Sequence, residues 1–157
     1  MGELEDFVGC TIKRDLTKTT LNISQTDIIN KKTQGFNEDV KSLMTFNNPA
    51  TPHKDVVCNK YTDTSISYNL QKRYKSGVGL ILYLLKHPRP ELSNAIRELS
   101  KCMDKSNMNQ YKTLLHAIKY MIDTKHYSYQ VKPDRNLNGT WEIHVYSDTD
   151  KSGNNNS

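Results

Sequence analysis

Asp148 and Asp150 are the acidic pair whose position best suits chemistry. They follow Trp141, Ile143 and Val145, whose alternation with polar residues predicts a strand. Carboxylates just past the end of a strand can point into a cleft and hold Mg²⁺ through hard oxygen ligands. A solvated loop with two turn-forming aspartates would show the same pattern. Two carboxylates also fall short of the cage that two-metal hydrolysis requires, so we expect no tight Mg²⁺ binding here.

Positive charge is concentrated in one segment of the chain. The 157 residues include 22 Lys and Arg and 17 Asp and Glu, a formal net charge of +5. Residues 72–125 hold 11 basic and 4 acidic side chains, a net charge of +7, and each flanking segment carries −1. A clustered positive field attracts polyanions such as a nucleic-acid backbone. A solvated helical surface is the alternative interpretation of this composition.

The cysteines and the apolar runs restrict the class of protein. Cys10, Cys58 and Cys102 are far apart, odd in number and without a Cys-x-x-Cys pair, which argues against a disulfide scaffold and a zinc site. No basic-then-apolar leader follows Met1, so we expect an intracellular protein, in the cytoplasm or nucleus, and no secretion. The longest apolar run, residues 78–85, is far shorter than the roughly 20 residues that span a bilayer.

The first third of the chain predicts a hairpin, a short helix and a connector. Apolar residues alternate over residues 8–12 and 21–23, on either side of a polar turn at 15–19. Ser24 then has the chemistry of an N-cap for a helix over about residues 25–34. Residues 37–67 show little periodicity and contain two prolines, which is typical of a connector.

Three amphipathic helices are predicted in the basic segment. Pro88 ends the first and Pro90 opens the second. Their apolar stripes follow helical spacing and comprise Leu70, Tyr74, Val78, Ile81, Leu82 and Leu85, then Leu92, Ala95, Ile96, Leu99, Cys102 and Met103, then Tyr111, Leu114, Leu115, Ile118, Met121 and Ile122. Helices with one apolar face and short joints should pack as a bundle, and Gly77 and Gly79 should let them approach closely.

The last part of the chain predicts a second hairpin. Residues 127–131 and 141–145 alternate between apolar and polar side chains, and the turn-rich residues 133–139 separate them. The expected fold class is therefore α+β: an N-terminal β-hairpin with a short helix, a central three-helix bundle, and a C-terminal β-hairpin.

Ordered motifs along nearly the whole chain resemble one family, the polyprotein of copia-type retrotransposons. Their order and spacing together are specific. They are Gly2-Glu3-Leu4 with Phe7 and Gly9, Ile23-Ser24-Gln25, Thr51-Pro52, Tyr74-Lys75-Ser76-Gly77-Val78-Gly79 with Leu82-Tyr83-Leu84, Arg89-Pro90-Glu91-Leu92, and Tyr146-Ser147-Asp148-Thr149-Asp150 with Gly153. The chain departs from the family at Leu80, where the family has Ser, and at Lys151, where it has Trp.

The resemblance implies a role for each segment. Residues 1–36 would be the end of a reverse-transcriptase palm, 37–67 a connector, 68–125 a thumb that grips primer–template, and 126–157 the start of an RNase H domain. Asp148 would be the first metal-binding carboxylate of RNase H, with Mg²⁺ as the family's cofactor. The basic excess lies on the helices that would face a phosphate backbone. The residues that we expect to contact phosphates are Arg73, Lys75, Lys101, Lys112 and Lys119.

The resemblance also limits the activity that we expect. Phosphoryl transfer in this family needs metals held by several acids, and only one of those acids has a counterpart here. We therefore expect a polymerase fragment without activity alone, which keeps affinity for an RNA–DNA hybrid or duplex. Two alternatives stay open: a standalone nucleic-acid-binding helical module, and a chain that completes a polymerase in trans.

Overall fold

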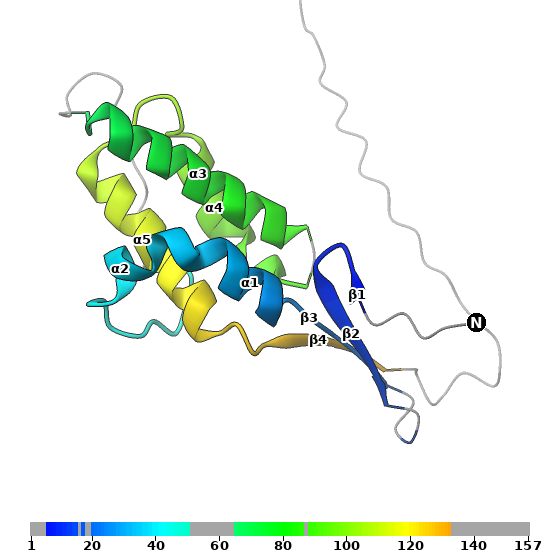
Figure 1. Ribbon diagram of the computed structural model, residues 1–157. Helices are drawn as coiled ribbons and strands as arrows, with labels where there is room; N and C mark the ends of the chain where they lie inside the picture. The colour runs from blue at the N-terminus through cyan, green and yellow to red at the C-terminus, as the bar shows by residue number, and fades with distance from the viewer. Residues whose placement is uncertain (1–5, 16, 18–19, 51–64, 87, 133–157) are drawn as a thin grey trace, which may run out of the picture.

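The computed structural model describes residues 6–15, 17, 20–50, 65–86 and 88–132 (Figure 1). A four-stranded antiparallel sheet lies at one end of a helical body (Figure 1). This arrangement confirms the α+β fold class.

The sheet combines strands from both ends of the described chain. Its strands are β1 (Asp6–Phe7), β2 (Cys10–Asp15), β3 (Thr20–Ser24) and β4 (Ser128–Val131), in the order β1-β2-β3-β4. The predicted N-terminal hairpin is confirmed, because β2 pairs antiparallel with β3 from Thr11↔Ser24 to Asp15↔Thr20. β4 pairs antiparallel with β3 from Leu21↔Val131 to Ser24↔Ser128.

The place of β4 differs from the expected boundary at residue 126. We expected residues 127–131 to begin a separate C-terminal hairpin, but the structure adds them to the sheet of the N-terminal segment. The strand expected over residues 141–145 lies outside the described residues. Because strand pairing over about a hundred residues leaves no local signal, periodicity alone could not reveal this partner.

β1 and β2 are joined by a tight turn at Val8 and Gly9. Both residues have positive φ, 52° and 76°, between the paired residues Phe7 and Cys10. This is the conformation of a two-residue hairpin turn whose twist matches the strands. Glycine adopts it freely, whereas a β-branched valine is strained there, and strain of this kind costs on the order of 1–3 kcal/mol.

The segment after the hairpin is more structured than expected. Helix α1 (Thr26–Thr33) is followed by the 3-10 turn η1 (Gln34–Phe36) and α2 (Asn37–Val40). The expected Ser24 cap is wrong: the N-cap residue is Gln25, without a side-chain cap hydrogen bond, and Ser24 belongs to β3. Phe36 and Val40 are buried in the core, and Leu43 and Phe46 pack against it, so the described residues 37–50 are more ordered than a connector.

The three predicted helices of the basic segment are present. They are α3 (Tyr68–Leu85), α4 (Ser93–Ser100) and α5 (Met108–Asp123), and the 3-10 turn η2 (Pro90–Leu92) precedes α4 with Pro90 at its start. The Ser67 side chain caps α3, and Asn107 and Gln110 form a capping box at the start of α5. These caps satisfy backbone N–H groups that a helix start leaves without partners.

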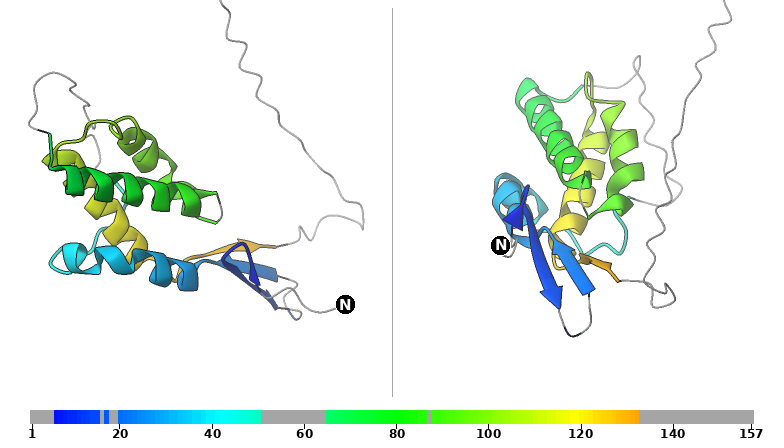
Figure 2. Two further views of the ribbon diagram at one scale, coloured as in Figure 1. Left: turned by 45° about the horizontal axis from the view of Figure 1, so that its top comes forward. Right: turned by 90° about the vertical axis from the view of Figure 1, so that its right-hand side faces the viewer.

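α5 is the centre of the helical body. It packs against α3 and α4 on one side and α1 and α2 on the other, as both views of Figure 2 show. Most of the predicted apolar positions are buried, including Tyr74, Val78, Ile81, Leu114 and Ile118. Leu70, Leu85, Met103 and Ile122 are partly buried, and Leu82 is exposed on the outward side of α3. Leu84, which was not in the predicted stripe, is buried instead.

The two α3 glycines differ in their surroundings. A Cβ atom on Gly77 would lie 2.7 Å from Leu114 Cδ2 and 3.2 Å from Phe36 Cζ, so the predicted close approach is confirmed there. A Cβ atom on Gly79 would meet no atom of the described residues within 4 Å, so the same prediction is wrong for Gly79.

Two further expectations concern compartment. Cys10 is a buried thiol, whereas Cys102 is disulfide-bonded, although the spacing of the cysteines argued against a disulfide scaffold. Within the described ranges, no helix has the length and apolar character that crossing a membrane requires.

Candidate nucleic-acid interface

Arg73, one of the five expected phosphate contacts, is held by the protein itself. Its guanidinium donates to the Gly35 carbonyl at 2.7 Å and to the Tyr111 hydroxyl at 3.3 Å, and it forms an ion pair with Asp39. The hydrogen bond to Tyr111 is the main cause of a raised Arg73 pKa, and Asp39 adds to it. These contacts tie α3 to α5 and to the α1–α2 segment, so Arg73 acts as a clamp in this structure.

Lys101 and Lys119 are also engaged with carboxylates. Lys101 Nζ lies 2.6 Å from Glu98 Oε2, and this hydrogen bond is the main cause of a lowered Glu98 pKa. Lys119 Nζ lies 2.7 Å from Asp123 Oδ1, and the Lys119 side chain is only 17% exposed. An ammonium group already paired with a carboxylate contributes little net attraction for a phosphate.

Lys112 is exposed, but it belongs to α5 and not to α3. One turn further along α5, the His116 ring stacks on Phe46 at 3.6 Å between centroids, and His116 Nε2 lies 3.0 Å from the Asn48 carbonyl oxygen. This side of α5 is therefore covered in part by the segment that follows α2, and His116 is half-buried there.

Lys75, the fifth expected contact, belongs to a row of exposed lysines on α3 and its C-cap residue, Lys86. Lys72, Lys75 and Lys86 are exposed and make no ion pair or hydrogen bond with the residues that the structure describes. Because an α-helix advances about 100° per residue, these three positions fall within an arc of about 60°. We call this set the lysine face of α3. It lies opposite the buried side of the helix.

A groove runs beside the lysine face, between α1 and α3. Its volume is about 320 Å³. It is lined by Lys32, Phe36, Ser76, Gly79, Leu80 and Tyr83. Gly79 leaves an opening at this surface, and the ring of Tyr83 is 38% exposed. The Tyr83 hydroxyl lies 3.5 Å from the Val8 carbonyl oxygen, at the tip of the β1–β2 turn.

Arg89 is basic but inaccessible. It is 1% exposed, and its guanidinium donates to Thr124 Oγ1 at 2.6 Å and to the Thr124 carbonyl at 3.3 Å. It also pairs with Glu91. A buried guanidinium with all of these partners fixes the C-terminal end of α5 against the η2 turn and takes no part in a surface site.

The expected metal ligands Asp148 and Asp150 lie outside the described residues. Among the residues that are described, no group of three or more His, Cys, Asp or Glu side chains is placed to hold a metal ion. The Mg²⁺ site therefore stays a prediction.

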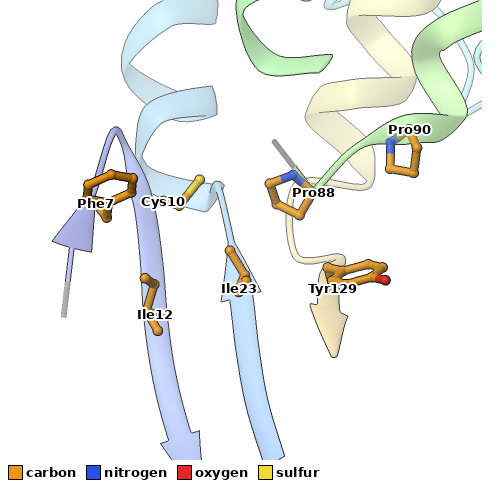
Figure 3. Close-up of a pocket in the computed structure, with 7 residues that line it drawn as sticks. All are labelled: Phe7, Cys10, Ile12, Ile23, Pro88, Pro90 and Tyr129. Carbon is orange, nitrogen blue, oxygen red and sulfur yellow. The ribbon is translucent and has the colours of Figure 1, made fainter. Parts of the chain in front are cut away.

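A second hollow lies beside the sheet and has different chemistry. It has a volume of about 440 Å³. Figure 3 shows side chains of β1, β2 and β3 on one side and the two prolines with Tyr129 of β4 on the other. The lining residues are Phe7, Cys10, Ile12, Ile23, Pro88, Pro90 and Tyr129. Binding sites usually pair an apolar lining with a few polar groups that orient the ligand. Among the lining residues that the structure describes, none carries a charge, so these residues offer nothing to fix an ionic ligand.

Several residues of the interface were missed by the sequence analysis. Lys72 and Lys86 share the helical face of Lys75, and a helical projection of residues 68–86 would have found them. Lys32 lies some forty residues earlier in the chain, so only the packing of α1 beside α3 could bring it to the groove. Tyr83 appeared in a motif but had no role assigned.

The resemblance to the copia-type polyprotein stays a prediction. No family model, no curated protein and no solved structure matches this chain.

Proposed function

We propose that this chain binds nucleic acid through the lysine face of α3. The observation that carries the proposal is the row of Lys72, Lys75 and Lys86, exposed on one side of a single helix and without a carboxylate partner among the described residues. Clustered ammonium groups on a rigid element attract a phosphate backbone and release its counterions.

The distribution of ion pairs supports this choice of surface. In the basic segment, Arg73, Arg89, Lys101 and Lys119 are paired with acidic side chains, whereas Lys72, Lys75 and Lys86 have no such partner among the described residues. Lys112 of α5 is a further exposed lysine without a carboxylate partner there. The resemblance to a retrotransposon polymerase thumb agrees with the proposal, since the helices of such a thumb contact primer–template.

The test replaces the three lysines together. The variant Lys72→Gln, Lys75→Gln, Lys86→Gln should bind a labelled DNA duplex or RNA–DNA hybrid at least about tenfold more weakly at moderate salt. The slope of log affinity against log salt should fall by about 0.9 for each phosphate that the variant no longer neutralises. Fluorescence anisotropy over a series of salt concentrations measures both quantities.

The matched control removes the same charge elsewhere. Lys13, Lys41 and Lys101 are exposed and lie on β2, at the end of α2 and at the end of α4. Their triple change to Gln lowers the net charge by the same amount but leaves the lysine face of α3 intact. It should therefore reduce the affinity for nucleic acid much less. Equal losses in the two variants would contradict the proposal, because binding would then follow net charge and not the α3 surface.

A further inference from the structure

We propose that the groove between α1 and α3 takes one nucleotide of a single-stranded nucleic acid, with its base against the ring of Tyr83. The proposal rests on the proposed function and specifies its ligand. It follows from the combination of an exposed aromatic ring, a gap at Gly79 and cationic side chains on both flanking helices.

The size of the groove fits a ligand of this kind. At about 320 Å³ it lies at the small end of the roughly 300–1,000 Å³ that small-ligand sites occupy, so it has room for one nucleotide unit. Phe36 and Leu80 provide apolar surface within the lining, and Gly79 has no side chain to fill the space above α3. A helical glycine with open space costs stability relative to alanine, so an opening maintained by Gly79 is consistent with use by a ligand.

Tyr83 is suited to stack on a base. Its ring lines the groove and is 38% exposed, and its hydroxyl lies 3.5 Å from the Val8 carbonyl oxygen, which restricts the orientation of the ring. Stacking on aromatic side chains is the main way in which proteins hold single strands without reading their sequence. In a duplex, both faces of each base are covered by neighbouring bases, so a single strand is the nucleic acid that this ring can engage.

The charges around the groove complement a phosphate backbone. Lys32 of α1 lines it directly. On α3, Lys75 precedes the lining residue Ser76 and lies one turn before Gly79, on the lysine face. A base in the groove would therefore have ammonium groups from two helices near its flanking phosphates, and Ser76 could donate a hydrogen bond to one of them.

The experiment compares a labelled oligothymidylate with a labelled duplex, using anisotropy and the full chain. Tyr83→Leu removes the ring and should weaken oligothymidylate binding about 5- to 150-fold, the range for one stacked base, with duplex binding nearly unchanged. Tyr83→Phe keeps the ring and should retain most of the affinity. Gly79→Leu fills the opening without meeting any described atom within 4 Å of its Cβ, so it should also weaken single-strand binding while the protein stays folded.

Tyr68 provides the matched control. It is the first residue of α3, is 82% exposed and does not line the groove, so Tyr68→Leu should leave oligothymidylate binding unchanged. Wild-type affinity in both Tyr83→Leu and Gly79→Leu would overturn the inference, as would equal losses in Tyr83→Leu and Tyr83→Phe. If the triple lysine variant still lost duplex binding in those cases, the groove inference would fail but the proposed function of the lysine face would remain supported. Failure of the wild-type chain to bind either probe would overturn both.

Discussion

The two sides of α3 show how one helix can serve the core and the surface. Its inner side carries Tyr74, Gly77, Val78, Ile81 and Leu84, which are all buried. Its outer side carries the lysine face, Gly79 and Tyr83. The two glycines are separated by a single residue, yet one is closed in by neighbouring side chains and the other faces open space.

The different surroundings of Gly77 and Gly79 indicate that the two glycines are present in α3 for different reasons. Gly77 is required by packing, because α5 and Phe36 approach the α3 backbone at that point. Gly79 has no packing requirement among the described residues, so its cost to helix stability must be explained in another way. Substitutions at the two positions therefore test whether the two sides of α3 have the roles assigned to them.

The largest effect is expected from Gly77→Leu. The new side chain would begin 2.7 Å from Leu114 Cδ2 and 3.3 Å from Ile118 Cδ1, both in the buried core, and would have to displace α5 or Phe36. Forced overpacking of this kind should lower the free energy of unfolding by about 3 kcal/mol, even after the better helix propensity of leucine is counted. Urea unfolding followed by circular dichroism measures the change.

Gly79→Leu is the matched control for this prediction. It makes the same chemical change two residues further along the same helix, where the new Cβ meets no described atom within 4 Å. Its free energy of unfolding should equal or exceed that of the wild type. Similar destabilisation by both substitutions would show that the two sides of α3 do not differ as described.

The inner side of α3 was largely predictable from sequence, and its neighbours were not. Apolar residues at helical spacing predicted Tyr74, Val78 and Ile81 as buried, because burial of one helix face leaves a strong periodic signal. The burial of Phe36 and Val40 left no such signal, since they lie in a short turn and a helix of four residues. Tertiary packing alone decides which side chains such short elements bury.

The second prediction concerns the buried hydroxyl of Tyr74. This group donates to the Leu99 carbonyl at 2.7 Å and joins α3 to α4. Tyr74→Phe should lower the free energy of unfolding near neutral pH by about 1–2 kcal/mol, because a buried hydrogen bond is removed. Denaturant unfolding at pH 8 measures the change, and Tyr68→Phe, at an exposed position of the same helix, should have no effect.

The same variant should change how stability depends on alkaline pH. Burial raises the pKa of Tyr74 above its ordinary value of 10.0, and Tyr120 is shifted in the same direction, also by burial. A group whose folded pKa is raised stabilises the protein below its unfolded pKa, and this contribution is lost as the pH rises above about 10. The difference between wild type and Tyr74→Phe should therefore shrink above pH 10. Parallel stability curves through that range would contradict the burial of this hydroxyl.

The outer side of α3 illustrates what sequence reasoning could and could not find. Composition located the basic excess, and Lys75 was among the expected contacts. Arg73 lies two residues earlier, but its guanidinium donates hydrogen bonds to Gly35, Asp39 and Tyr111. No local sequence pattern links the segments of these three residues to α3. Which lysines keep their charge unpaired depends on where the acidic side chains fall in space, and only the folded arrangement supplies that information.

The smallest effect is expected from Gly79→Ala. Alanine adds one methyl group in open space and restricts the unfolded backbone, so the free energy of unfolding should rise by between about 0.5 and 1 kcal/mol. A methyl group is too small to fill a groove of about 320 Å³, so oligothymidylate binding should change much less than in Gly79→Leu. Thermal unfolding and anisotropy on the same preparation measure the stability and the binding.

An opening kept for a ligand predicts a more stable protein in both Gly79 variants. Duplex binding should stay intact, and single-strand binding should fall slightly in the alanine variant and more in the leucine variant. Destabilisation by alanine would instead mean that Gly79 faces a neighbour, and the contrast with Gly77 would disappear.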